Sequence, residues 1–376
     1  MTWRHLNEVA YTTSLISKDP TPRQRCRWRC SPIPHFNHSV NPLRAASFTT
    51  TAQSKLQRVA DWPRLPPSIT LDRVIGVGVD SRGFVYVAHR GEHPLLCLYP
   101  DGRLCREVGA DVQQKSIAYD VRGPVPIPME TRYWLHGLHV DPWDNVWVTD
   151  VSRHLVMKFG PEGNLLLTLG VDGERGCDDR HFNQPTHVCV LPSGDFFVTD
   201  GYGNSRIVKF NILGERILEW GTRGTAPGQF HTPHAITLGD NGFLYVSDRE
   251  NFRIQVFDEA GRIQGFWEGL HGVDGLYAAS DGFLYGSAGV DHAVVRLDRS
   301  GCIHDVWVDK ERFTYPHGIA IGPDGAIYLA DSGDDWILHR GMPDAPDRTY
   351  RLVPRNGGEG SRVVKLRIAA DEPIHQ

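Results

Sequence analysis

Three histidines occur at the same place in a repeated pattern of the sequence. His136, His234 and His317 each precede an alternation of apolar and other residues, and an aspartate follows each of them after fourteen residues. Three neutral imidazoles that leave a fourth coordination position to water or substrate are typical of a catalytic zinc site. The alternative is that each histidine only hydrogen-bonds a loop carbonyl at the start of a strand. We predict the zinc site, with Zn²⁺ as the cofactor.

Three further residues lie in turns that follow strands of the same pattern. Arg90 suits a place beside a dication, because the fork of a guanidinium pairs with both oxygens of a carboxylate. Tyr202 stands between Gly201 and Gly203 on a sharp turn, and a phenol near a cation and an arginine can have its pKa lowered enough to act as a base. Arg249 occupies the matching turn of the next repeat. The alternatives are surface arginines and a tyrosine that packs on a neighbouring repeat.

The histidines belong to a unit of strand, turn and strand that occurs six times. The first residues of the six units, in chain order, are Ile75, His136, Thr186, His234, Asp274 and His317. Units spaced roughly 40 to 60 residues apart are typical of propeller blades that contain four short strands each. We therefore predict an all-β fold, a six-bladed β-propeller of four-stranded antiparallel blades around a central channel. Alternate positions on a six-fold ring form a triangle, so the three imidazoles should converge on the axis.

The composition narrows the classes of function. The chain has 376 residues, of which 40% are hydrophobic and 23% charged, and its net charge is −5. No basic bias indicates nucleic acid, and no stretch approaches the roughly 18 apolar residues of a membrane span. The seven cysteines are scattered, which favours free thiols in a reducing compartment. We expect a cytoplasmic monomer that binds neither nucleic acid nor membrane.

The chain divides into three parts by composition. Residues 1–55 are rich in arginine and poor in acidic residues, have no apolar core of a secretory signal, and are expected to form a disordered leader. A transit peptide, a disordered tail and a start codon assigned too far upstream all remain open for them. Residues 56–345 form the predicted propeller, and residues 346–376 form a tail. Within the tail, Arg362–Ile368 alternates and is a candidate for a ring-closing or edge strand.

An insertion separates the first two repeats. It runs from Gly109 to Glu130 and is rich in proline, glycine and charged residues. Long loops on a rigid scaffold usually carry function or mobility. We expect one of these roles here.

Short motifs occur in a fixed order between residues 56 and 340. They include Asp61-Trp-Pro63, His89-Arg-Gly-Glu-His93, Leu135-His-Gly-Leu138, Asp200-Gly-Tyr202, Pro227-Gly-Gln-Phe230, Asp248-Arg-Glu-Asn251 and Pro316-His317. This ordered set resembles the peptidyl-α-hydroxyglycine α-amidating lyase family, the lyase domain of peptidylglycine amidation, which is a six-bladed propeller of the NHL-repeat type. NHL-type strands alone would be a weak signal, whereas the ordered set is a strong one.

The resemblance implies a division of labour among the site residues. It implies that zinc is held by three ligands, His136, His234 and His317. It further implies that three residues lie at the reacting centre, Arg90, Tyr202 and Arg249. It also implies a structural calcium ion on the axis, with the backbone carbonyls of Val77 and Leu138 among its ligands.

The sequence departs from the family pattern at several positions. The calcium-binding aspartate after the third histidine is Gly318 here, which removes one calcium ligand. The methionine two residues before that histidine is Tyr315, which changes the pocket wall. The family's cysteine pair falls on Asn183 and Gly203, so that disulfide is absent, in agreement with a reducing location. The chain contains no copper-hydroxylase domain, so we expect another protein to make the hydroxylated substrate.

These observations predict a zinc lyase. Its substrate would be a small or peptide-like N-acyl-α-hydroxyglycine, and its products a primary amide and glyoxylate. Ureidoglycolate has the same N–CH(OH)–COO⁻ core, so a ureidoglycolate lyase is the nearest alternative. A lactonase-like metal hydrolase would usually hold calcium through acidic and amide ligands, and a non-catalytic NHL interaction propeller would need no histidines on the axis.

Overall fold

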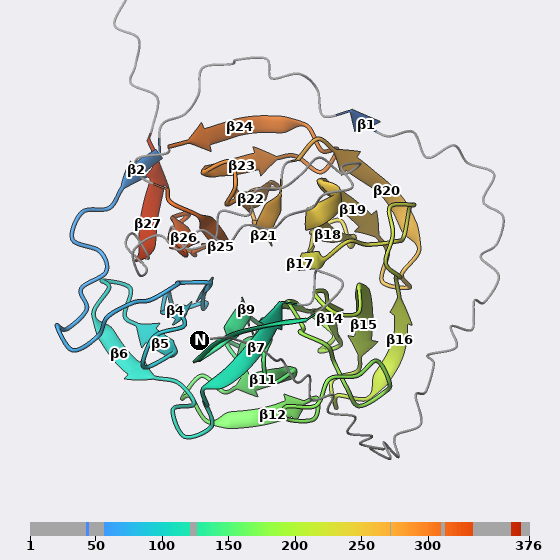
Figure 1. The fold of residues 1–376 in the computed structure, drawn as a ribbon. Coiled ribbons are helices and arrows are strands. Elements are labelled where there is room, and N and C mark those ends of the chain that lie inside the picture. Colours follow the sequence, from blue (N-terminus) through green and yellow to red (C-terminus); the bar gives the residue numbers. More distant parts are fainter. Residues whose placement is uncertain are drawn as a thin grey trace, which may run out of the picture. The chain divides into compact units, whose positions relative to one another are not determined.

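Six antiparallel blades of four strands are arranged in a ring in the computed structural model of the protein (Figure 1). The structure describes residues 43–44, 56–120, 126–270, 272–309, 313–333 and 362–369. All of them belong to the unit Ser39–Gln376. The predicted all-β, six-bladed propeller is therefore confirmed.

The first three blades use consecutive strands. Blade 1 contains β3 (Gly76–Val79), β4 (Val85–Ala88), β5 (Leu95–Leu98) and β6 (Leu104–Glu107). Blade 2 contains β9 (Leu135–Val140), β10 (Val146–Asp150), β11 (Leu155–Phe159) and β12 (Leu165–Leu169). Blade 3 contains β13 (His187–Val190), β14 (Phe196–Asp200), β15 (Arg206–Phe210) and β16 (Arg216–Trp220).

The next two blades follow the same plan. Blade 4 contains β17 (Pro233–Leu238), β18 (Leu244–Asp248), β19 (Arg253–Phe257) and β20 (Ile263–Glu268). Blade 5 contains β21 (Val273–Ala278), β22 (Leu284–Ala288), β23 (Ala293–Leu297) and β24 (Ile303–Val308). A short strand, β1 (Leu43–Arg44), pairs in parallel with the outer edge of blade 4.

Blade 6 combines strands from distant parts of the sequence. It contains β25 (Pro316–Ile321), β26 (Ile327–Asp331), β27 (Arg362–Ile368) and β2 (Leu56–Arg58). β27 lies antiparallel between β26 and β2, so blade 6 extends past the boundary at residue 345 that the sequence suggested. Apart from β1, the leader 1–55 lies outside the described residues, as does 334–361. Contacts between β25 and β3 close the ring.

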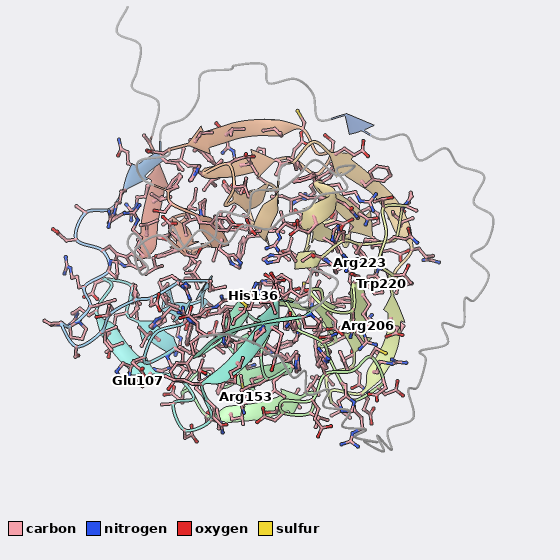
Figure 2. The ribbon with its side chains drawn as sticks, in the orientation of Figure 1. Glu107, His136, Arg153, Arg206, Trp220 and Arg223 are labelled. Carbon is pink, nitrogen blue, oxygen red and sulfur yellow. The ribbon has the colours of Figure 1, made fainter. Side chains whose placement is uncertain are left out.

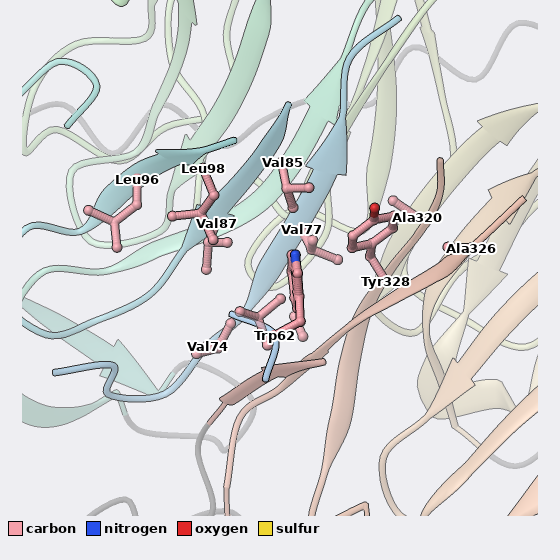
Figure 3. Close-up of a cluster of buried hydrophobic side chains, with 12 residues drawn as sticks. Trp62, Val74, Val77, Val85, Val87, Leu96, Leu98, Ala320, Ala326 and Tyr328 are labelled. Carbon is pink, nitrogen blue, oxygen red and sulfur yellow. The ribbon is translucent and has the colours of Figure 1, made fainter. Parts of the chain in front are cut away.

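Apolar clusters lie between neighbouring blades. The second strands of blades 2 to 6 are buried along their whole length, because each is covered by a blade on either side. Figure 3 shows the cluster between blades 6 and 1, in which Trp62 meets Tyr328 edge-to-face with ring centroids 5.3 Å apart. Outer strands such as β12 and β16 alternate between exposed and half-buried residues. The burial of the inner blade faces makes the ring a rigid support for residues at the axis.

Buried acceptors hold the chain just before the innermost strand in four of the six blades. Asp248, at the end of β18, accepts a hydrogen bond from the backbone N–H of His231 at 2.7 Å, just before β17 begins. Asp200 and Asp331 make the same type of contact in blades 3 and 6. In blade 1 the acceptor is His89 Nδ1, which lies 3.4 Å from the N–H of Asp72. His89 therefore takes the place of the aspartate that ends the second strand in four of the other five blades.

The insertion between blades 1 and 2 forms a hairpin outside the blades. Its strands, β7 (Ser116–Asp120) and β8 (Ile127–Arg132), make a separate two-stranded antiparallel sheet. In Figure 1 β7 is drawn across blade 2, between the labels of β9 and β11.

Helix is nearly absent from the described residues. They contain one short 3₁₀ turn, η1 (Arg249–Asn251). No helix in this part of the chain has both the length and the apolar character that crossing a bilayer requires.

The cysteines do not all behave as predicted. Four of the described cysteines, Cys97, Cys105, Cys189 and Cys302, are free thiols. Cys177 is disulfide-bonded, so the prediction of free thiols is wrong for this residue.

Candidate active site

The three histidines of the repeats meet at the axis of the ring. They come from β9, β17 and β25, and Figure 2 shows His136 near the middle of the ring, whereas Glu107 and Arg153 lie out in the blades. The ring centroids of His136, His234 and His317 lie 4.7 to 5.0 Å apart. One nitrogen of each lies within 4.8 Å of the other two, and all three residues are buried. The structure thus brings together the side chains that the spacing of the repeats predicted to converge.

Backbone carbonyls of the intervening blades orient the three rings. The Nδ1 atoms lie 2.7 to 2.9 Å from carbonyl oxygens, in the pairs His136–Thr186, His234–Asp274 and His317–Ile75. A carbonyl can only accept, so each Nδ1 carries the hydrogen and each Nε2 keeps its lone pair. The carbonyl bonds that the sequence analysis treated as an alternative to metal binding therefore leave Nε2 available. Such bonds from the second ring nitrogen are characteristic of metal-binding histidines.

Burial keeps these imidazoles neutral. It lowers the pKa of His317 to about 3. Burial, with a contribution from His317, holds the pKa of His136 well below its usual range. Burial and the nearby Arg249 do the same for the pKa of His234. Three neutral nitrogen donors with fixed tautomers fit a zinc ion.

Tyr202 lies directly beside the histidines. Its hydroxyl oxygen is 2.9 Å from His136 Nε2 and 3.1 Å from His234 Nε2. Neighbouring glycines allow the turn that carries it: a Cβ at Gly201 would lie 2.2 Å from the carbonyl oxygen of Pro233, and the backbone leaves no room for it. The phenol is therefore held by close packing where it faces the axis.

Arg249 is a buried cation with carboxylate partners. Its Nη1 donates to Asp274 Oδ1 at 2.9 Å, and its Nη2 lies 3.0 Å from Glu250 Oε1. Its guanidinium carbon lies 5.5 Å from the centre of the Tyr202 ring. Burial alone would lower the pKa of Arg249, but Tyr202, Glu250 and Asp274 outweigh it and raise that pKa.

Arg90 is buried without such partners. Its guanidinium lies 4.4 Å from the ring centre of Trp134, and its Nε is 3.4 Å from the carbonyl oxygen of Leu135. Among the described residues, no carboxylate forms an ion pair with it. Burial lowers the pKa of Arg90 to about 10, so the group still carries its charge at neutral pH.

One pocket contains all the predicted catalytic residues. It has a volume of about 670 Å³, open space at its mouth included. Its lining includes Arg90, Tyr202, Arg249, His136 and His317. Residues that the sequence analysis did not assign to the site also line it, among them Met129, Trp134, Gln184 and Ser332.

The sequence contains recognised repeats and has named relatives. The NHL repeat model matches residues 182–210, 230–257 and 313–338. Peptidyl-α-hydroxyglycine α-amidating lyase 2 of Drosophila melanogaster is 30% identical over 326 residues, which are 80% of this chain and 76% of that protein. The chain belongs to the peptidyl-α-hydroxyglycine α-amidating lyase family. The resemblance stated from the sequence motifs is thereby confirmed.

Longer relatives contain the matching region as one part. Peptidyl-glycine α-amidating monooxygenase B of Xenopus laevis is 33% identical over 366 residues, which cover 87% of this chain and 40% of that protein. The chain thus spans well under half the length of that relative. A solved streptogramin B lyase structure matches 84% of this chain and 98% of its own, with a TM-score of 0.53 and 18% identity. At that identity the likeness shows the fold alone.

In this member of the lyase family, Asp274 connects two parts of the site. Its backbone carbonyl accepts from His234 Nδ1 at 2.7 Å, and its carboxylate accepts from Arg249 Nη1 at 2.9 Å. The other carboxylate oxygen accepts the N–H of Gly289 at 3.0 Å. In the sequence, Asp274 is recognisable only as the first residue of a repeat. Its position in the same slot as the histidines was the signal that it reaches the axis.

The channel on the opposite side of the histidines does not fit a calcium ion. It has a volume of about 320 Å³, and Val77, Leu138 and His187 are among its lining residues. A Cβ at Gly318 would lie 2.7 Å from the Ile75 carbonyl oxygen, so the backbone leaves no space for an aspartate there. Calcium takes roughly six to eight oxygen ligands and favours carboxylates. Among the described channel residues, the one carboxylate is that of Asp274, which faces Arg249. The calcium site implied by the resemblance therefore has no adequate donor set here.

Proposed function

We propose that the protein is a zinc-dependent carbon–nitrogen lyase that converts N-acyl-α-hydroxyglycines to a primary amide and glyoxylate. The observation that supports this most directly is the Tyr202 oxygen, which lies within hydrogen-bonding distance of two Nε2 atoms in a pocket with two buried guanidinium groups. The relatives named as amidating lyases support the same chemistry. Bound by His136, His234 and His317, a zinc ion would act as a Lewis acid that makes the substrate hydroxyl more acidic.

The two arginines have different roles in this proposal. Arg90 is buried without a carboxylate partner among the described residues, so a substrate carboxylate is the anion that compensates its charge. Arg249 already faces Asp274 and Glu250. Its remaining effect is on Tyr202, where a nearby cation stabilises negative charge on the phenol oxygen. Arg90 thus orients the substrate and Arg249 supports the base.

Tyr202 moves the proton in the reaction. In its deprotonated form it accepts the proton of the substrate hydroxyl, while the electrons of that O–H bond form the new C=O bond of glyoxylate. The C–N bond breaks and its electron pair goes to the amide nitrogen. Tyr202 then returns the proton to this nitrogen. Atoms and charge balance without another reactant.

The test is an assay of purified protein with an N-acyl-α-hydroxyglycine and with ureidoglycolate. Glyoxylate and the primary amide should form in equal amounts from the first substrate. The Tyr202→Phe variant should retain its metal and lose roughly 10²- to 10⁴-fold in kcat. Release of glyoxylate from ureidoglycolate alone would move the assignment to a ureidoglycolate lyase, and no release from either substrate would reject the lyase.

A further inference from the structure

A second group of metal-ligating side chains lies on blade 5, at its outermost strand. It consists of Asp298, Cys302 and His304, which lie in the turn between β23 and β24 and at the start of β24. Figure 1 shows β24 at the outer edge of the ring. One carboxylate oxygen, the thiol sulfur and one ring nitrogen all lie within 4.8 Å of one another. Cys302 is a free thiol, and both it and His304 are exposed, so an ion from solvent can reach the group.

The backbone of the turn fixes the position of Asp298. Its Oδ1 accepts the N–H of Ser300 at 2.8 Å and that of Cys302 at 3.1 Å. In the same turn of blade 3, Asn211 Oδ1 accepts the N–H groups two and four residues later. Oδ1 thus has a structural role that an amide oxygen can also fill, whereas Oδ2 faces another partner.

Blades 4 and 5 differ in the side chains that face this second oxygen. In blade 4, Asp258 Oδ2 accepts from Arg262 Nε at 2.6 Å and from Gln264 Nε2 at 3.4 Å. The same two positions of blade 5 hold a cysteine and a histidine, and His304 Nε2 lies 3.0 Å from Asp298 Oδ2. An arginine side chain has only donors and cannot bind a cation, whereas a thiolate and a neutral imidazole are the usual ligands of zinc. Blade 5 therefore has metal ligands where blade 4 has an ion pair.

Among the described residues, the only ion-pair partner of Asp298 is His304. The adjacent arginine, Arg299, pairs with Asp240 instead. The His304 ring also meets the ring of Phe283 edge-to-face, with centroids 5.1 Å apart. The carboxylate and the imidazole are thus both held in place, and no arginine neutralises the carboxylate.

We propose that Asp298, Cys302 and His304 bind a zinc ion on the outer strand of blade 5, in addition to the ion proposed at the axis. Ligand atoms of a tetrahedral zinc ion lie roughly 3.4 Å apart, since its bonds are about 2.0–2.3 Å long. The Oδ2–Nε2 pair, now 3.0 Å apart, has to open only slightly. The ion replaces the hydrogen on Nε2 and that of the thiol, so binding releases protons to solvent, and water fills the fourth position. This site does not depend on the proposed lyase function.

Cobalt distinguishes this site from the axial one, because only a thiolate ligand produces a sulfur-to-cobalt charge-transfer band. The probe is Co²⁺, added in excess to metal-free protein that is kept under argon so that the thiol stays reduced. The band should appear in the wild-type protein and in His317→Ala, and it should be absent from Cys302→Ser. Cys105→Ser is the matched control, because Cys105 is also a free thiol that is not fully buried, and it should keep the band.

Two further variants test the other ligands. Asp298→Asn keeps an oxygen that accepts the N–H groups of the turn, as Asn211 does in blade 3, but it removes the charged ligand. Asp298→Asn and His304→Ala should each weaken the cobalt affinity that the band reports by at least about tenfold, because loss of even an outer-shell partner has that effect. Asp258→Asn, in the equivalent turn of blade 4, is the control and should keep the wild-type affinity.

Absence of the band in the wild-type protein would overturn the proposal. Persistence of the band in Cys302→Ser, or its loss in Cys105→Ser, would assign it to another thiol and also overturn the proposal. Unchanged affinity in both Asp298→Asn and His304→Ala would show that the thiol binds cobalt without the other two side chains, which would overturn the three-ligand site. Melting curves of the variants show whether the fold is retained.

Discussion

The histidine triad, which consists of His136, His234 and His317, has two sides that differ in their structure, although the same six blades form both. On the pocket side, Arg90, Tyr202 and Arg249 project from the turns after second strands and supply charge and a hydroxyl. On the channel side, inner strands come close together and their residues are largely apolar or glycine, such as Val77 and Gly137. The pocket side therefore supplies chemical groups through its side chains. The channel side contributes through the positions of its backbone atoms.

Substitutions on the two sides of the histidines should therefore affect different properties of the protein. Turn positions on the pocket side can change their side chain with little effect on the strands, so changes there should affect activity more than stability. On the channel side, two of the three backbone carbonyls that hold the imidazoles, those of Thr186 and Ile75, lie against glycines. Changes there should act on stability and on metal affinity together.

Removal of a triad member should have the largest effect, because it acts on both sides at once. His317→Ala should lose about one zinc ion per chain, and activity should fall to the level without enzyme, since two nitrogen donors remain where catalytic zinc usually has three protein ligands. Metal analysis and the glyoxylate assay measure this. His181→Ala is the control, because His181 pairs with Asp178, whose side chain is 62% exposed, and this variant should keep both zinc and activity. Full metal content in His317→Ala would contradict the assigned ligands.

Next in size is a change confined to the pocket side. Arg90→Ala should lower kcat/KM by roughly 10²- to 10³-fold, because the site loses its uncompensated cation. Zinc content and the urea midpoint should stay close to wild type. Arg103→Ala is the control, since the Arg103 side chain is 66% exposed and pairs with Asp101 on the surface. A wild-type rate in Arg90→Ala would place the substrate carboxylate elsewhere.

Acid should weaken the metal-free fold through the buried histidines. The folded pKa of His317 is about 3, against an ordinary value of 6.5. Between these values the unfolded chain binds protons that the folded chain does not, so stability is fully present above pH 6.5 and is lost as the pH falls towards 3. Each such histidine adds a slope of up to about 1.4 kcal/mol per pH unit. Urea midpoints of EDTA-treated protein from pH 7.5 to 4.5 test this, and a midpoint that rises on acidification would contradict it.

A change confined to the channel side should have a smaller, mixed effect. A Cβ at Gly137 would lie 2.3 Å from the Thr186 carbonyl oxygen, which is the acceptor for His136 Nδ1. Gly137→Ala should therefore cost about 1–3 kcal/mol of stability and weaken zinc binding roughly 10- to 100-fold. Gly265→Ala is the control, because nothing lies within 4 Å of its added Cβ. Unchanged zinc affinity in Gly137→Ala would show that the position of the Thr186 carbonyl does not affect zinc binding.

The smallest effect should come from calcium. The channel offers no adequate set of oxygen donors around Val77 and Leu138, so added calcium or EGTA should leave the melting temperature of the zinc-loaded protein unchanged. Zinc is kept constant by buffering, so that EGTA does not remove it. A rise of several degrees with calcium would show that the channel binds it in spite of Gly318.

Much of the site could be predicted from the sequence because it repeats. The first position of each repeat marks the same place in each blade, so the recurrence of histidine there indicated convergence before any coordinates were known. Arg90, Tyr202 and Arg249 occupy equivalent turns for the same reason. His89 could be recognised as occupying the place of an aspartate, but only the structure shows that its Nδ1 makes a comparable contact with the strand entrance.

Other features depend on contacts between distant residues, which a local pattern does not contain. The sequence alone determined the six-fold repeat, the axial histidines and the family, since each depends on residue types at short, regular spacing. Only the tertiary structure decided that β27 completes blade 6 beside β2, that the insertion forms a wall of the pocket, and that Asp274 holds both His234 and Arg249. These depend on how close separate segments come once the ring has closed, and the distances at the axis are set by the packing of all six blades together.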